Sequence, residues 1–343
     1  MESSARFSSG CCTFDGEYGS IERKKREAVE RVEKKNYNGL DLCKFFMMIV
    51  VIAIHTGAVP QDGSPVAVRA YSVVSNLAVQ SFFLISGFLL GSRMEEPFSL
   101  PENRQVLVRY LKRILKMYLT WMLIYTPLTI INYLRHSTPL LKAAVLYLRG
   151  LLLMGEQYNS FQLWYLLSTV YALCLLLFLA KRGASLWQAA ALGTFLLIPS
   201  AFLYWITGAR GTLTGTPGKI AQFLYLALGS GRLLLGAFCL PMGMLLAKRP
   251  IPNIAAWALL ILGAGAMTRQ PSGLVFQAMA AIGLVSLLSK AELPDAPVYP
   301  ALRKMSTAGY LIHMYVYTFF TGWPRESAGK GRFPLPQRRQ LPC

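Results

Sequence analysis

A chain of 343 residues has the length of two soluble domains, but its composition points elsewhere. Hydrophobic residues make up 54 % of the chain and charged residues only 15 %, against about 25 % charged residues in an average soluble protein. The mean hydropathy is +0.41. This composition excludes a disordered chain, argues against a soluble enzyme, and predicts an all-α, polytopic transmembrane helix bundle.

The net charge of +19, from 35 Lys and Arg against 16 Asp and Glu, needs its own explanation. A basic excess can indicate nucleic acid, an anionic lipid surface or a phosphorylated small molecule. In a membrane protein it can also reflect the enrichment of basic residues in cytoplasmic segments. Where the basic residues lie along the chain tests these alternatives.

The six cysteines show no spacing typical of a metal site, and three of them lie in apolar runs. We interpret them as packing residues or incidental thiols, and we expect neither a disulfide framework nor a bound metal. They are Cys11, Cys12, Cys43, Cys174, Cys239 and Cys343.

The polar segment 1–39 is predicted to be a cytosolic arm, because the first apolar run begins too late for a signal peptide. The membrane domain is expected over 40–323, with about nine spans present of an expected ten. Runs of about 20 apolar residues predict spans at 40–59, 72–92, 114–134, 161–180, 185–206, 231–247, 251–267, 271–289 and 305–323. The segments 139–154 and 219–230 are apolar but short.

The basic residues fix the expected orientation. With the N-terminus inside, 21 Lys and Arg fall in inner segments and seven in outer loops, which predicts a multi-pass protein of the plasma or inner membrane with a cytoplasmic N-terminus. The same asymmetry accounts for most of the basic excess, so no nucleic-acid partner is expected. The polar tail 324–343 breaks the pattern, since it is basic yet predicted outside, and it is interpreted as a truncated or frame-shifted end.

Ionisable residues inside a span are costly without a partner or a function. The first span contains Asp41, Lys44 and His55. Eleven residues place Lys44 and His55 on one helix face, about 16 Å apart along the axis, and Asp41 lies one turn before Lys44, where the two can pair. The pattern predicts a polar channel with a histidine base near the outer end. The alternative is an interfacial ion pair and an interfacial histidine.

Further candidates lie on other spans. His313 is near the middle of the last span, whereas His136 falls in an outer loop. Arg232 lies in a Gly-rich span, either pointing into the channel or serving as a buried partner of Asp41. The basic cluster of Arg109, Lys112, Arg113 and Lys116 precedes the third span, and it suits a phosphate ligand. Positive-inside flanking is its alternative interpretation.

Several motifs occur in a fixed order on these spans. They are the Lys44-x10-His55 spacing, the run FFLISGFLL at 82–90, Arg113-x-x-Lys116, the Leu-Trp-Tyr at 163–165 and STAGYLIH at 306–313. Over roughly 36–320 the chain resembles the acyltransferase-3 family of integral membrane acyltransferases. The family pattern has Arg where Lys44 and Lys116 stand here. Lysine keeps the charge but lacks the bidentate fork of arginine.

This resemblance implies transfer of an acyl group, typically acetyl, from cytosolic acyl-CoA to a hydroxyl of a cell-envelope sugar or lipid-linked acceptor. It implies that Arg113 and Lys116, with Arg109 and Lys112 nearby, bind the donor phosphates. The acyl group then passes Lys44, and His55 acts as the base. Trp164 and Tyr165 are expected to be channel-wall or interfacial aromatics.

Two rival interpretations remain. Similar membrane domains occur in vancomycin-resistance serine racemases, where such a domain is thought to supply the amino acid. This chain could be that kind of substrate-supply domain without its racemase. A small-solute transporter would predict an inverted repeat, and the sequence shows no convincing one.

Overall fold

The structure is a computed structural model that describes residues 36–57, 64–270 and 273–321. These residues form helices and connections, with no strand among them, which confirms the predicted all-α class. The predicted arm, apart from residues 36–39, and the predicted tail lie outside the described residues.

Apolar runs and local end signals set the first three helices. Helix α2 (Asn38–Thr56) ends at Gly57, whose φ of 72° is left-handed and suits glycine. Helix α3 (Pro65–Gly91) begins with Pro65 in its first turn, and the Ser64 hydroxyl accepts a hydrogen bond from the amide of Ala67. Helix α4 (Pro101–Arg135) is the longest at 35 residues, and it also begins with a proline.

The middle of the chain holds shorter pieces. Helix α5 (Leu140–Arg149) continues into a π-helical turn, η1 (Gly150–Met154), and a 3₁₀ turn, η2 (Phe161–Leu163), leads into α6 (Trp164–Lys181). Helix α7 (Leu186–Gly208) begins with a capping box in which Ser185 and Gln188 satisfy each other's backbone amides. The turn η3 (Ala209–Gly211) and helix α8 (Gly215–Leu228) complete this part.

The last part of the chain returns to long apolar helices. The turn η4 (Arg232–Leu234) opens α9 (Leu235–Lys248), and α10 (Asn253–Arg269), α11 (Leu274–Ser289) and α12 (Val298–Phe320) follow. Each of the nine predicted spans therefore overlaps a helix, and residues 58–59, 271–272 and 322–323 of these spans lie outside the described residues. Five of these helices, α2, α3, α4, α7 and α6 extended by η2, are long and apolar enough to cross a membrane by length and composition, and α10 and α11 are shorter apolar helices.

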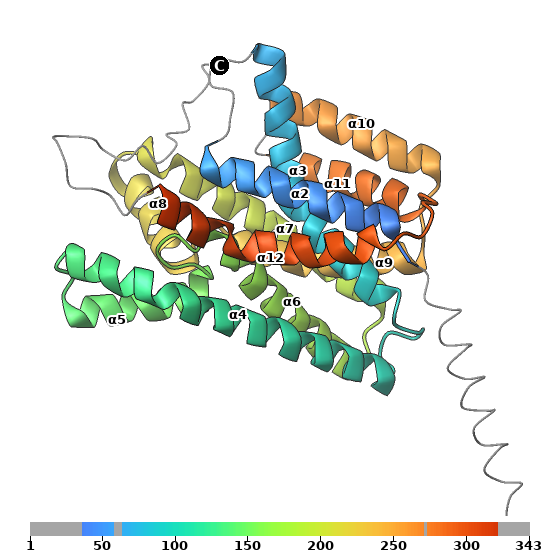
Figure 1. Cartoon of the computed structure of the whole chain (residues 1–343), viewed down its shortest axis with the longest axis horizontal. Helices are drawn as coiled ribbons and strands as arrows, with labels where there is room; N and C mark the ends of the chain where they lie inside the picture. Colours follow the sequence, from blue (N-terminus) through green and yellow to red (C-terminus); the bar gives the residue numbers. More distant parts are fainter. Residues whose placement is uncertain (1–35, 58–63, 271–272, 322–343) are drawn as a thin grey trace, which may run out of the picture.

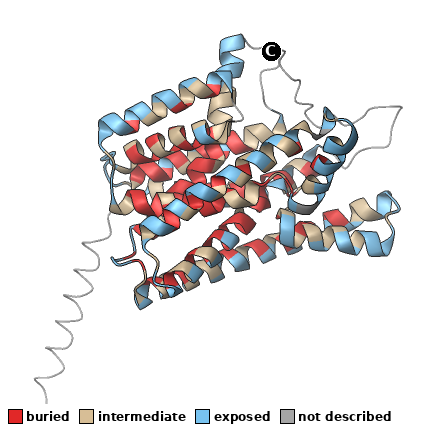
Figure 2. Ribbon diagram, turned by 180° about the vertical axis from the view of Figure 1, so that it is seen from behind, coloured by how far each residue is buried: buried red, intermediate tan, exposed pale blue. Residues whose placement is uncertain are grey.

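Buried residues concentrate in the centre of the bundle, where α3, α6 and α9 lie, whereas α5 has no buried residue (Figure 2). Glycines allow the closest approaches. A Cβ added to Gly87 would lie 2.2 Å from the carbonyl oxygen of Leu240, and one added to Gly243 would lie 2.2 Å from that of Leu84. The backbones of α3 and α9 thus touch through small residues, as is common between membrane helices.

Helices α2, α4 and α12 start at the same end of the bundle and run in the same direction (Figure 1). Since α2 and α12 also pack against each other, their first turns are neighbours. This shared end, which contains Asp41 and Arg303, is called the inner end below, following the predicted orientation. The opposite end, which contains His55, is called the outer end.

Candidate active site

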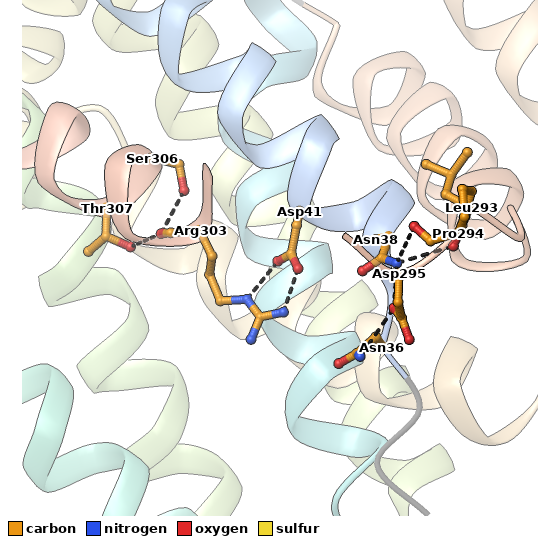
Figure 3. Close-up of polar contacts among 9 residues, drawn as sticks. All are labelled: Asn36, Asn38, Asp41, Leu293, Pro294, Asp295, Arg303, Ser306 and Thr307. Carbon is orange, nitrogen blue, oxygen red and sulfur yellow. Dashed lines mark hydrogen bonds and ion pairs between the residues drawn. The ribbon is translucent and has the colours of Figure 1, made fainter. Parts of the chain in front are cut away.

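At the inner end, an ion pair joins the first and last helices. Both oxygens of the Asp41 carboxylate accept hydrogen bonds from Arg303, with the Nε bond at 2.9 Å (Figure 3). The Asp41 side chain is 3 % exposed and the Arg303 side chain 50 % exposed. The prediction that Asp41 pairs with Lys44 one turn away, and the alternative that it pairs with Arg232, are both corrected here. A guanidinium on α12 offers two parallel donors that an ammonium does not.

Lys44 instead lines a cavity of about 190 Å³ beside this ion pair. Four basic side chains line this inner cavity, and none of its described lining residues is Asp or Glu. The four are Lys44, Arg93, Arg113 and Arg303. A cavity of this charge suits an anionic ligand.

The predicted phosphate-binding cluster divides on the structure. Arg113 lines the inner cavity. Arg109, Lys112 and Lys116 are exposed on α4 and are not among the residues that line it. Of this cluster, Arg113 is therefore the residue that the structure brings together with Lys44.

His55 lines a second cavity of about 200 Å³ toward the outer end of the bundle. Trp164 and Arg232, both predicted to face a channel, line this outer cavity as well. It also has several neutral polar side chains, among them Asn76, Gln80, Gln162 and Gln277. The outer cavity thus combines one imidazole with many neutral hydrogen-bonding groups.

A second imidazole packs against His55. The rings of His55 and His313 are stacked with centroids 5.4 Å apart. His313 Nδ1 lies 2.9 Å from the carbonyl oxygen of Tyr310. Because that oxygen can only accept, Nδ1 carries the hydrogen and Nε2 of the neutral ring is an acceptor. This Nε2 is buried and has no partner among the described residues.

Arg232, which lines the outer cavity, donates a hydrogen bond from Nε to the Ser230 hydroxyl at 2.7 Å and makes two further contacts. Its guanidinium lies 3.2 Å from Glu156 and 5.0 Å from the centroid of the Trp164 ring. Glu156 lies in the connection between η1 and η2, outside the predicted spans. Burial raises the pKa of its carboxyl group, and the nearby Arg232 only partly opposes this.

An aromatic cluster lines the inner cavity, and one of its rings also lines the outer cavity. Phe82, Tyr165 and Tyr310 contact one another with ring centroids 5.3 to 6.2 Å apart. Phe82 and Tyr165 line the inner cavity, and Tyr310 lines both. The sequence predicts one continuous polar channel from Lys44 to His55. The structure has a cavity at each end of this predicted channel, and Tyr310 lines both.

Sequence reasoning missed several residues of this site. The sequence indicates Arg93 and Arg303 only as basic residues of inner segments, and no pattern singles out Glu156. One sequence signal could have identified Arg303. It lies one turn before Ser306, the first residue of the STAGYLIH motif, and so near the inner end of the last span, just as Asp41 lies near the inner end of the first. The buried glutamines left no comparable signal.

A bundle of apolar helices with a basic cavity at one end and a histidine cavity at the other defines a multi-pass membrane protein with polar cavities inside its helix bundle. The family model described as an acyltransferase domain matches residues 37–327. The chain therefore belongs to the acyltransferase-3 family, which makes it a transferase.

Two curated proteins of Enterococcus faecalis are similar to part of the chain, and both are named amino-acid racemase. One is 31 % identical over 149 residues, covering 43 % of this chain and 20 % of the relative. The other is 26 % identical over 153 residues, covering 44 % and 19 %. The matched region is thus about a fifth of each relative's length. No solved structure matches the chain.

Proposed function

We propose that the protein moves a small acyl group, acetyl in the simplest case, from cytosolic acyl-CoA to a hydroxyl of a cell-envelope sugar or lipid-linked acceptor. The observation that carries the proposal is the pair of cavities that are both lined by Tyr310. One is lined by four cationic side chains and the other holds an imidazole. A donor with several phosphates and an acceptor with a hydroxyl would thus enter from opposite ends.

In this mechanism Lys44 and Arg113 bind the anionic donor at the inner cavity. The acyl group passes Tyr310, which lines both cavities. The hydroxyl oxygen of the acceptor attacks the thioester carbonyl while His55 takes the hydroxyl proton. The CoA thiolate then leaves. The stacked ring of His313 holds His55 in place. A thioester is already activated, so positioning and one base are sufficient.

The experiment follows transfer of label from radioactive acetyl-CoA to envelope material in membranes that contain the protein. His55→Ala should abolish transfer while leaving the amount of protein in the membrane unchanged. His136→Ala is the matched control, because His136 is an exposed histidine at the end of α4. Transfer by His55→Ala at the wild-type rate would remove His55 from the mechanism.

A second function is favoured by the names of the relatives. The chain could be the membrane domain that supplies an amino acid to a racemase. Vesicles that contain the protein would then accumulate labelled L-serine and would not consume acetyl-CoA. The proposed transferase requires the reverse pattern.

A further inference from the structure

A chain of three side-chain amides runs beside the outer cavity. Asn76 Nδ2 donates to the backbone carbonyl of Ser72 at 2.8 Å. Because that carbonyl can only accept, the orientation of the Asn76 amide is fixed and its Oδ1 faces the other way. This oxygen accepts from Gln277 Nε2 at 3.2 Å. Gln277 Oε1 in turn accepts from Gln80 Nε2 at 2.7 Å.

The direction of this amide chain determines which atom of Gln80 is left over. Since Gln80 Nε2 is used as a donor, its Oε1 is the terminal acceptor, and it has no partner among the described residues. Gln80 is 1 % exposed and lines the outer cavity. An unpaired buried acceptor destabilises the fold, so its persistence requires an explanation.

A second glutamine on another element repeats the arrangement. Gln162 Nε2 donates to the backbone carbonyl of Leu311 at 3.0 Å and to the Tyr125 hydroxyl at 2.8 Å. The carbonyl again fixes the amide nitrogen, so Gln162 Oε1 is the free end, and it too has no partner among the described residues. Gln162 is 1 % exposed and lines the same cavity.

The charges around the outer cavity indicate which class of ligand would donate hydrogen bonds to the free oxygens of Gln80 and Gln162. Both are neutral acceptors, and the described residues that line the cavity include no Asp or Glu to balance an ammonium group. Arg232 is already paired with Glu156. Neutral hydroxyl donors therefore fit better than a zwitterionic amino acid.

We infer that Gln80 and Gln162 are specificity-determining residues that each accept a hydrogen bond from a hydroxyl of a neutral, polyhydroxylated acceptor held beside His55. This inference rests on the proposed function and names the chemistry by which the acceptor is chosen. A site built to pair with hydroxyls rejects analogues that lack them, because its buried acceptors then stay unpaired.

The test measures occupancy of the outer cavity without requiring acyl transfer. The purified full-length chain in detergent is treated with diethyl pyrocarbonate, and the modification rates of His55 and His136 are followed by mass spectrometry. D-Glucose is the polyhydroxylated probe, cyclohexanol is a ring with one hydroxyl, and N,N-dimethylglycine is a zwitterion. His136, exposed at the end of α4, is the internal standard.

D-Glucose should slow modification of His55 but not of His136. Gln80→Met and Gln162→Met should each raise the glucose concentration needed for half-protection by about tenfold, which corresponds to about 1.4 kcal/mol. Gln222→Met is the matched control, because Gln222 is exposed on α8, and it should behave as wild type. The two test variants lie on different elements, so misfolding of one leaves the other informative.

Absence of glucose protection, equal protection in the two test variants, or stronger protection by cyclohexanol or N,N-dimethylglycine would overturn the inference. The readout separates this inference from the proposed catalysis. If His55→Ala transfers acetyl at the wild-type rate while glucose still protects His55 of the wild-type protein, only the proposed mechanism is rejected. Loss of protection, with transfer still dependent on His55, would reject the glutamine assignment alone.

Discussion

Removing the arginine of the Asp41–Arg303 pair is the most informative change to the packing at the inner end. Arg303→Ala leaves a carboxylate whose side chain is 3 % exposed without its two donors. Removing one partner of a fully buried pair costs about 3–5 kcal/mol. The Arg303 side chain is 50 % exposed, so water can replace part of the lost bonds. We therefore expect a loss of about 2 kcal/mol in the free energy of unfolding.

The assay is thermal unfolding in detergent, followed by tryptophan fluorescence. With an unfolding entropy of about 2.1 cal/mol/K per residue, a chain of 343 residues loses about 1.4 °C in Tm per kcal/mol, so the expected fall in Tm for Arg303→Ala is roughly 3 °C. Adding Asp41→Asn to Arg303→Ala should recover at least half of this loss, because the stranded charge is then removed.

Lys44→Met distinguishes the observed Asp41–Arg303 pair from the Asp41–Lys44 pair that local spacing predicts. It should leave the Tm nearly unchanged, since the carboxylate of Asp41 is bound by Arg303. A large loss of stability in Lys44→Met, together with a wild-type Tm for Arg303→Ala, would refute the reasoning.

Three further predictions concern other parts of the molecule. Arg113→Ala should raise the KM for acetyl-CoA about tenfold, whereas Lys116→Ala, outside the cavity wall, should change it less than about twofold in the same initial-rate assay. Gly87→Ala should destabilise the protein by about 1–3 kcal/mol because its Cβ would meet the Leu240 carbonyl, whereas Gly265→Ala, which faces open space, should be neutral or stabilising in thermal unfolding. Because burial raises the pKa of Glu156, its charged form is disfavoured in the folded state. Glu156→Gln should therefore leave the stability at pH 7 unchanged or slightly raise it. Any gain in stability over the wild type should shrink as the pH falls, because the wild-type carboxyl group is then protonated. A fall of several degrees in the Tm of that variant at pH 7 would contradict this.

The helices could be predicted from the sequence because hydropathy is a local property. Every predicted span overlaps a helix, since an apolar run in a membrane has to form the hydrogen bonds of its own backbone amides and carbonyls. The orientation, the donor and the acceptor stay predictions. Crossing ability by length and composition is established for five of the helices, so the count of nine spans also stays a prediction.

The partners inside the site were harder to predict because they come from distant parts of the chain. Sequence spacing shows only neighbours on one helix, so Asp41 was paired with Lys44, whereas its partner Arg303 is 262 residues away. The sequence predicts a single channel that contains Lys44, His55 and Arg113, and in the structure Lys44 and Arg113 line the inner cavity and His55 the outer one. The aromatic cluster at Tyr310 depends on how α3, α6 and α12 pack, and spacing along one helix does not reveal it.

The central claim is that donor and acceptor reach the reacting centre from opposite ends of the bundle. Sealed membrane vesicles of the two orientations, supplied with labelled acetyl-CoA on the outside, test it most directly. The account predicts His55-dependent transfer only in inside-out vesicles, whose exposed face carries the cavity of Lys44 and Arg113. Equal transfer in sealed right-side-out vesicles, or transfer that persists in His55→Ala, would contradict it.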